Sequence, residues 1–269
     1  MIRHLLRLPR HIFLALIAVF MAAPLVVVAG VSLNATRRMS FPPERFGWNW
    51  YEVFFTTPAW LSSLQWSLLI AAAAALVSTS VAVPVAYAIW RFNSRFSKLL
   101  SGFGALAFML PPVVLAVVFM IFWGFIGHVG RVENTVLSHA VVLLALPLVT
   151  VSLGFQSIDR SVIEVAETMG ATDNYVFRTV IAPIVMPYVL CGALFVFVLS
   201  INEYIIAYMV AGFAVETLPI KVFNSMRLGF EPTMCVGAVL FMLLGAGTFC
   251  LIARFGDLPK LLGAASPRD

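Results

Sequence analysis

The sequence predicts an all-α polytopic membrane protein with about six transmembrane helices and one amphipathic segment on the cytoplasmic side. Three observations support this fold class. Hydrophobic residues make up 62% of the 269 residues and charged residues only 11%, whereas soluble domains carry about 25% charged residues. The apolar runs are long and unbroken, unlike the alternating pattern of membrane barrels. The basic residues cluster between these runs. We therefore expect a single transmembrane domain over residues 1–269, with its apolar surface in contact with membrane lipids.

Six apolar runs are long enough to cross a bilayer. The first follows three arginines, as the apolar part of a signal peptide would. Its length of about 20 residues instead favours a retained helix. Prolines at 111, 112 and 147 predict kinks inside the third and fourth spans. We expect a short interfacial helix around Trp48 to Phe55 and a polar external loop over 212–232. The spans are predicted at 12–31, 64–90, 100–126, 136–155, 183–211 and 234–253.

The distribution of basic residues predicts the orientation. Of the 17 lysines and arginines, 11 fall on the side of both termini and of segment 156–182, and 6 on the other. Positive residues stay cytoplasmic, so both termini and that segment are expected inside the cell. The net charge of +5 therefore reflects membrane orientation, and no basic face interleaved with aromatics predicts nucleic-acid binding.

Several kinds of chemistry are not predicted. The three cysteines lie in apolar segments, and they and the four histidines show no ligand spacing, so we expect no metal site. None of the three lysines ends a phosphate-binding loop. We therefore expect no catalytic residue and no cofactor in this chain.

Segment 159–182 is the longest amphipathic stretch between two spans. Ser161 and Glu164 have the spacing of a capping box, and Gly170 suits the left-handed position that ends a helix. Thr172 or Asp173 can cap a second helix. A short helix with an apolar face is either a docking element for a soluble partner or a helix that lies at the membrane interface. The apolar residues at helical spacing are Val162, Val165, Ala166 and Met169.

This segment resembles the cytoplasmic signature of permeases in type I, binding-protein-dependent ABC importers. That signature reads Glu-Ala-Ala, three residues, Gly, about nine residues, then Ile-x-Leu-Pro. The sequence has Glu164-Val165-Ala166, then Gly170, then Val180-Ile181-Ala182-Pro183. The departures are Val165, Val180 and Ala182, all mild.

The resemblance implies a fold, a set of partners and a contact site. Segment 159–182 would hold the coupling helix that fits a cleft in a cytoplasmic ATPase subunit. Two such ATPases, which bind ATP and magnesium, are implied, together with a second, homologous permease subunit and a periplasmic substrate-binding protein. The location implied is the bacterial inner membrane. The implied ATPase-coupling residues are Ser161, Glu164, Ala166, Glu167, Met169, Gly170 and Ala171.

Glu203 is an ionisable residue inside the predicted fifth span, where a carboxylate marks a pathway or a polar contact. One interpretation is that it binds a cationic substrate, with stacking on Tyr204 or Tyr208. The other is a structural carboxylate that pairs with a neighbouring helix or is protonated. The candidate substrate-path residues are Asn202, Glu203, Tyr204 and Tyr208.

The stretch Ser200-Ile201-Asn202-Glu203-Tyr204 also resembles the polyamine branch of these permeases, which commonly reads Ser-Leu-Asp-Asp before an aromatic or apolar residue. One acidic residue here replaces two. The resemblance implies a polyamine as the first substrate class, with an opine, an amino-acid derivative or an organophosphonate as alternatives. An ion-coupled secondary carrier is the alternative class, although no internal repeat supports it.

Overall fold

A computed structural model describes the backbone of residues 7–255 and the side chains of residues 11–254. The predicted cytoplasmic residues 1–6 and tail 256–269 lie outside the described residues. Within the described part the chain is helical, and extended pairing is limited to one isolated bridge, Asn34–Phe46. Four helices are long and apolar enough to cross a membrane, or up to six spans if each of two bent helix pairs is one span. The prediction of an all-α membrane fold is therefore confirmed.

The two bent pairs break where the sequence removes helical hydrogen bonds. Helices α5 (Arg95–Met109) and α6 (Pro112–Phe125) meet at 115°. Leu110 and Pro111 are extended, as expected for residues that precede proline. Helices α7 (Val132–Val142) and α8 (Ala145–Gln156) meet at 48°, and Pro147 lies in the first turn of α8, where its missing N–H has no helical partner to lose. The third predicted span is therefore bent far more sharply than a kink.

Two further expectations need correction. The fifth predicted span, 183–211, is not continuous, because α11 (Ala182–Asn202) ends before Glu203 and α12 (Ile205–Ala211) begins after Tyr204. The predicted polar loop 212–232 contains helix α13 (Leu218–Leu228), whose apolar residues Leu218 and Ile220 are fully buried. A short helix is confirmed where an interfacial helix was expected, as α3 (Asn49–Thr56), and its place at the membrane interface stays a prediction.

The described residues form two compact units. The first comprises residues up to Ser62 and Lys221–Leu243. It contains α2 (Arg7–Ser32) and α3, and most of α13. Trp50 of α3 donates its indole N–H to the backbone oxygen of Asn34 at 2.6 Å, and Tyr51 forms a hydrogen bond with Ser32 at 2.9 Å. These bonds tie α3 to the end of α2.

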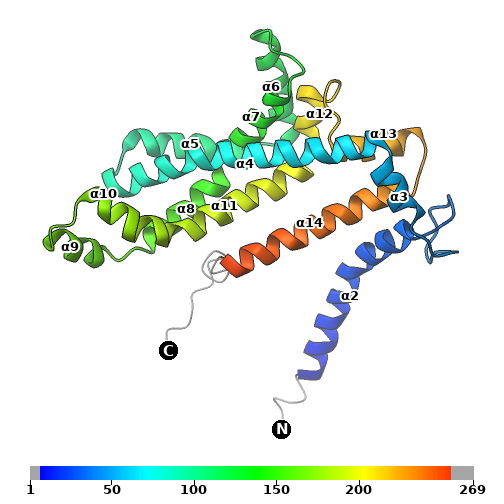
Figure 1. Ribbon diagram of the computed structural model, residues 1–269, viewed down its shortest axis with the longest axis horizontal. Helices are drawn as coiled ribbons and strands as arrows, with labels where there is room; N and C mark the ends of the chain where they lie inside the picture. Colours follow the sequence, from blue (N-terminus) through cyan, green and yellow to red (C-terminus); the bar gives the residue numbers. More distant parts are fainter. Residues whose placement is uncertain (1–6, 256–269) are drawn as a thin grey trace. The chain divides into compact units, whose positions relative to one another are not determined.

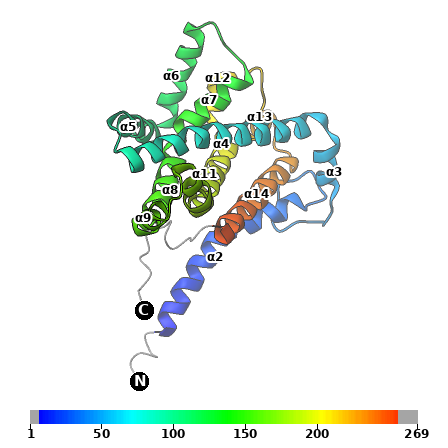
Figure 2. The same ribbon diagram turned by 60° about the vertical axis from the view of Figure 1, so that its left-hand side comes forward.

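The second unit, residues 63–220 together with those from Leu244 onward, holds both candidate sites. Figures 1 and 2 show α8 and α11 side by side in it. Glycines allow this close approach: a Cβ at Gly192 of α11 would meet Thr150 and Pro147 of α8 at 2.5 and 2.8 Å. Small residues bring membrane helices together in this way. Two segments connect α8 to α11, α9 (Arg160–Thr168) and α10 (Asp173–Val176), followed by a π-helical turn η1 (Phe177–Ile181).

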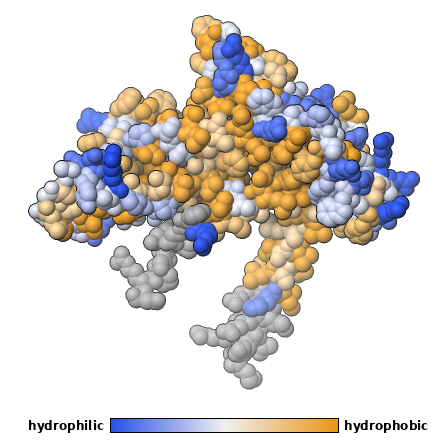
Figure 3. All heavy atoms as spheres, viewed as in Figure 1, coloured by the Kyte–Doolittle hydropathy of each residue, from blue (hydrophilic) through white to orange (hydrophobic). Residues whose placement is uncertain are grey.

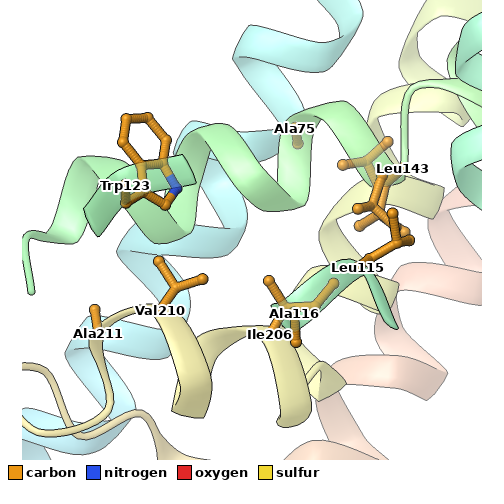
Figure 4. Packing of buried hydrophobic residues seen from close by; sticks show 10 residues of the cluster. Ala75, Leu115, Ala116, Trp123, Leu143, Ile206, Val210 and Ala211 are labelled. Atoms are coloured by element: carbon orange, nitrogen blue, oxygen red, sulfur yellow. The ribbon is translucent and has the colours of Figure 1, made fainter. Parts of the chain in front are cut away.

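A hydrophobic cluster fixes the opposite end of the second unit. Figure 4 shows Ile206, Val210 and Ala211 of α12 grouped with Leu115, Ala116 and Trp123 of α6. Ala75 of α4 (Pro58–Phe92) and Leu143, after α7, complete the labelled set. Helix α12 is therefore packed against α6 and α7 after the chain breaks away from α11.

The surface of the second unit divides by polarity. In Figure 3 hydrophobic residues dominate the visible face over the middle of this unit, whereas hydrophilic residues gather toward the end that carries α9 and α10. An exposed apolar surface of this kind is what lipid solvates. The α9 end is therefore one part of this unit that is suited to water.

Candidate functional site

The start of α9 is fixed by Asp159. Its side chain accepts a hydrogen bond from the backbone N–H of Ser161 at 2.9 Å, and this bond holds the pKa of the Asp159 carboxyl below its ordinary value. The capping-box prediction for Ser161 and Glu164 is wrong, because Asp159 lies upstream and starts the helix at Arg160. Both Ser161 and Glu164 are therefore exposed residues within the helix.

The end of α9 is fixed by Gly170. Its φ of +85° is the left-handed conformation that glycine adopts without a Cβ penalty. The N–H of Gly170 bonds to the oxygen of Glu167 and the N–H of Ala171 to the oxygen of Ala166, both at 3.0 Å. These two bonds are those of the Schellman motif. The prediction that Gly170 ends the helix is confirmed.

One face of α9 anchors it to the second unit. Ile163 is buried, and Ala166 and Ala171 are half-buried beside it. Beneath them Phe155 stacks on Trp90 with ring centroids 5.4 Å apart. This cluster connects α9 to the ends of α4, α8 and α11.

Arg91, in the last turn of α4, adds an electrostatic connection. Its guanidinium lies 3.8 Å from Glu167 on α9 and 3.8 Å from Asp173 on α10. Arg91 and Glu167 also line a groove with Trp90, Arg160, Ile163 and Glu164. One cation therefore faces both helices of the segment across the groove.

The other face of α9 is apolar and uncovered in this chain. Val162 is 48% exposed, Val165 57% and Met169 83%. The predicted apolar face therefore divides, because Ala166 turns inward with Ile163 while the other three residues turn outward. A rigidly held helix with outward apolar side chains can dock in a groove of another protein. The remaining predicted contact residues on α9, Ser161, Glu164 and Glu167, are also exposed, as is Gly170 after it.

Glu203 lies at the break between α11 and α12. Its carboxylate accepts hydrogen bonds from the backbone N–H groups of Ile206 at 2.9 and 3.0 Å and of Ala207 at 3.0 Å. These N–H groups belong to the first turn of α12, where a helix leaves donors without partners. Glu203 therefore caps α12.

His139 of α7 faces the same carboxylate. Its Nε2 lies 3.2 Å from Oε2 of Glu203, and its Nδ1 lies 2.8 Å from the hydroxyl of Ser200. His139 is 1% exposed. Of the two interpretations of Glu203, contact with a neighbouring helix describes this geometry, and contact with a solute stays a prediction.

The other candidate path residues lie around the break. The rings of Tyr204 and Tyr208 stack with centroids 5.5 Å apart, and Tyr208 is 38% exposed. Asn202 is exposed and donates to the oxygen of Val198 at 2.8 Å. The structure thus brings Tyr204 and Tyr208 together, with Glu203 turned toward His139.

Sequence reasoning missed Asp159, Arg91 and His139. Asp159 could have been found, since aspartate is among the preferred residues before a helix. Arg91 and His139 could not, because each meets its partner across more than 60 positions of the chain. No local spacing records such a contact.

Comparison with known proteins adds the family context. Residues 80–256 match the family described as binding-protein-dependent transport system inner membrane component. The chain is 26% identical to the spermidine/putrescine transport system permease protein PotC of Haemophilus influenzae, over 87% of this chain and 91% of that protein. It is 30% identical to the putrescine transport system permease protein PotI of Escherichia coli K12, over 88% and 86%.

A solved structure matches the fold. It is a bacterial ABC transporter involved in the import of the acidic polysaccharide alginate, with a TM-score of 0.71 and 15% identity over 94% of this chain and 97% of that one.

Proposed function

The chain belongs to the family of binding-protein-dependent transport system inner membrane components, and from this premise we propose that it is a membrane-spanning subunit of an ATP-driven polyamine importer. It forms part of the path through the membrane and carries out no chemistry on the solute. The path passes the α11–α12 break, beside Asn202, Glu203, Tyr204 and Tyr208.

The polyamine assignment is supported by the relatives. The PotC and PotI proteins are spermidine/putrescine and putrescine permeases by name, and both align over more than four fifths of either chain. The resemblance of residues 200–204 to the polyamine branch agrees with them. A polyamine is a flexible polycation, and the stacked tyrosines at the break offer π faces that attract cations.

The proposed partners are four kinds of molecule. A cytoplasmic ATPase pair binds ATP and magnesium and contacts α9. A second, homologous permease subunit completes the path. A periplasmic binding protein delivers the solute, and lipids cover the apolar surface. This arrangement requires that both termini and α9 lie on the cytoplasmic side, in agreement with the distribution of basic residues.

One observation carries the proposal: α9 is held rigidly and turns Val162, Val165 and Met169 outward. Asp159 and Gly170 fix its two ends, and Ile163 anchors its inner face. Apolar patches that are exposed to water mark binding sites on a protein surface. Because α9 is fixed to α4, α8 and α11, a displacement of α9 by a bound ATPase would also displace those helices. A membrane subunit driven by a separate ATPase needs a connection of this kind.

Crosslinking tests the ATPase contact. Met169→Cys, in a chain whose three native cysteines are replaced, should crosslink to the nucleotide-binding subunit produced with it. The matched control is Val129→Cys, which is also exposed but lies on the side predicted to be external. Crosslinking at 129 but not at 169 would overturn the proposal.

Uptake by proteoliposomes tests the substrate and the energy source. Uptake of labelled putrescine should require ATP and the binding protein, and spermidine should compete. Competition by an opine, an amino-acid derivative or an organophosphonate, but not by polyamines, would assign a different substrate. Uptake that follows an ion gradient without ATP would favour a secondary carrier.

A further inference from the structure

His139 contacts both sides of the break between α11 and α12. Ser200 lies in the last turn of α11 and Glu203 is the first residue after that helix. The two ring nitrogens of His139 face these two side chains, at 2.8 Å for Ser200 and 3.2 Å for Glu203. A single residue of α7 therefore joins the end of one helix to the cap of the next.

The Glu203 carboxylate already has partners in the first turn of α12 and in His139. It accepts from the backbone N–H groups of Ile206 and Ala207, and Nε2 of His139 lies 3.2 Å from its Oε2. An ionised carboxylate only accepts hydrogen bonds, so these contacts match an acceptor. Nε2 of His139 is fully buried and makes no hydrogen bond of standard geometry with any described residue. Its close neighbour is the carboxylate of Glu203, whose Oε2 lies 3.2 Å away.

The break in turn orients the two tyrosines. Tyr204 precedes α12 and Tyr208 lies one turn later, so their stacking depends on how α12 leaves α11. Ile206, between them, is buried in the cluster with α6. A change at the Glu203 cap would therefore alter the position and exposure of the Tyr208 side chain, which is the more exposed of the two tyrosines.

We propose that His139 is a positioning residue: together with Glu203 it fixes the α11–α12 break, and so sets the Tyr204–Tyr208 pair that faces the solute. Glu203 then acts through the break and does not bind the transported cation directly. The part that concerns the solute rests on the proposed function. The part that concerns the break does not.

The first experiment measures the geometry alone. Tyr208→Cys, in a chain without native cysteines, is labelled with a water-soluble maleimide, with and without His139→Gln. We expect the labelling rate at 208 to change by about fivefold or more, as for side chains coupled through a shared contact. Labelling of Val129→Cys, in a loop away from the break, should stay constant.

Glu203→Gln should change labelling at 208 in the same direction as His139→Gln, and the double variant should go no further. Two residues that act as a unit are not additive. Unchanged labelling at 208 in both single variants would overturn the proposal. If His139→Gln does not accumulate in the membrane, Ser200→Ala removes only the α11 contact and gives the same test.

The second experiment separates positioning from direct binding. Uptake is measured for putrescine, a dication, and spermidine, a trication. If His139 positions the tyrosines, His139→Gln and Glu203→Gln should change the spermidine-to-putrescine KM ratio by a similar factor, and the control His128→Gln should not. A rise in KM confined to Glu203→Gln would mean direct binding instead. If labelling at 208 is unchanged in His139→Gln and in Glu203→Gln, the positioning role is refuted. If the unmodified chain takes up no polyamine, only the proposed substrate is refuted.

Discussion

Arg91 lies 3.8 Å from Glu167, and this contact ties the last turn of the long α4 helix to the short α9 helix. Arg91 is equally close to Asp173, so both helices of segment 159–182 face one guanidinium. The Arg91, Glu167 and Asp173 side chains are 41%, 41% and 86% exposed. Solvent therefore screens both contacts. They contribute more to the orientation of α9 and α10 relative to α4 than to the stability of the fold.

Replacement of Arg91 should impair coupling while leaving the fold intact. Exposed ion pairs contribute about 0.2–1 kcal/mol each, so Arg91→Gln should reduce stability only slightly. Without the shared cation, α9 loses part of its fixed orientation, and ATP-driven uptake should fall severalfold. Uptake and thermal stability of the purified chain measure the two effects. Arg38→Gln, which removes another exposed ion pair, is the control, and an equal loss of uptake in both variants would contradict this role.

The loss of uptake caused by substitutions at Gly170 should follow how poorly each residue tolerates a positive φ, and not the size of its side chain. Its φ is +85° and an added Cβ would meet no atom within 4 Å, so space is available. The left-handed conformation costs most residues about 1–2 kcal/mol, whereas asparagine tolerates it better. We expect uptake to decrease in the order Gly, Asn, Ala, Val, with membrane insertion unchanged.

Uptake by those four Gly170 variants, divided by the amount of chain in the membrane, checks the order. If Ala and Asn were equally active and only Val failed, side-chain volume would be the cause instead.

The helix start at Asp159 should depend on pH. The pKa of Asp159 is lowered in the folded chain by the Ser161 N–H, so its ionised form is the one that caps α9. The capping contribution is therefore complete above the unfolded pKa of about 3.9 and is lost as the pH falls through the lower folded pKa. Asp159→Asn, which caps without a charge, should remove this dependence.

Amide hydrogen exchange at Ser161 and Val162, between about pH 2 and pH 5, tests the Asp159 prediction after correction for intrinsic rates. Protection that changes equally with pH in the wild-type chain and in Asp159→Asn would show that another group is responsible.

Gly192 should tolerate no larger residue. A Cβ there would lie 2.8 Å from the backbone of Pro147, so even alanine must separate α8 from α11. Overpacking of this kind costs about 1–3 kcal/mol. Gly192→Ala should lower the melting temperature in detergent, whereas Gly247→Ala, where no atom lies within 4 Å, should not. Equal melting temperatures for the two variants would show that the helices are free to separate.

Some of these features could be predicted from the sequence and others could not. The apolar runs, the end of α9 at Gly170 and the bend at Pro111–Pro112 depend on residues that are adjacent in the chain, so local rules find them. The break at Glu203 depends on His139, which is 64 positions away, and hydropathy across 183–211 stays high through it. Arg91 could not be predicted for the same reason, because its partners Glu167 and Asp173 come close to it only in the folded chain.

The break after Asn202 also divides the chain mechanically. Residues 173–202 form one 30-residue helical rod, about 45 Å long at 1.5 Å per residue. If α9 receives a push from an ATPase, as proposed, a displacement along this rod would reach Asn202. Beyond Asn202, α12 is packed against α6 and α7 and would be held by them. Under the proposed function, a displacement along the rod would therefore shift α11 relative to α12 at this junction, beside the two stacked tyrosines.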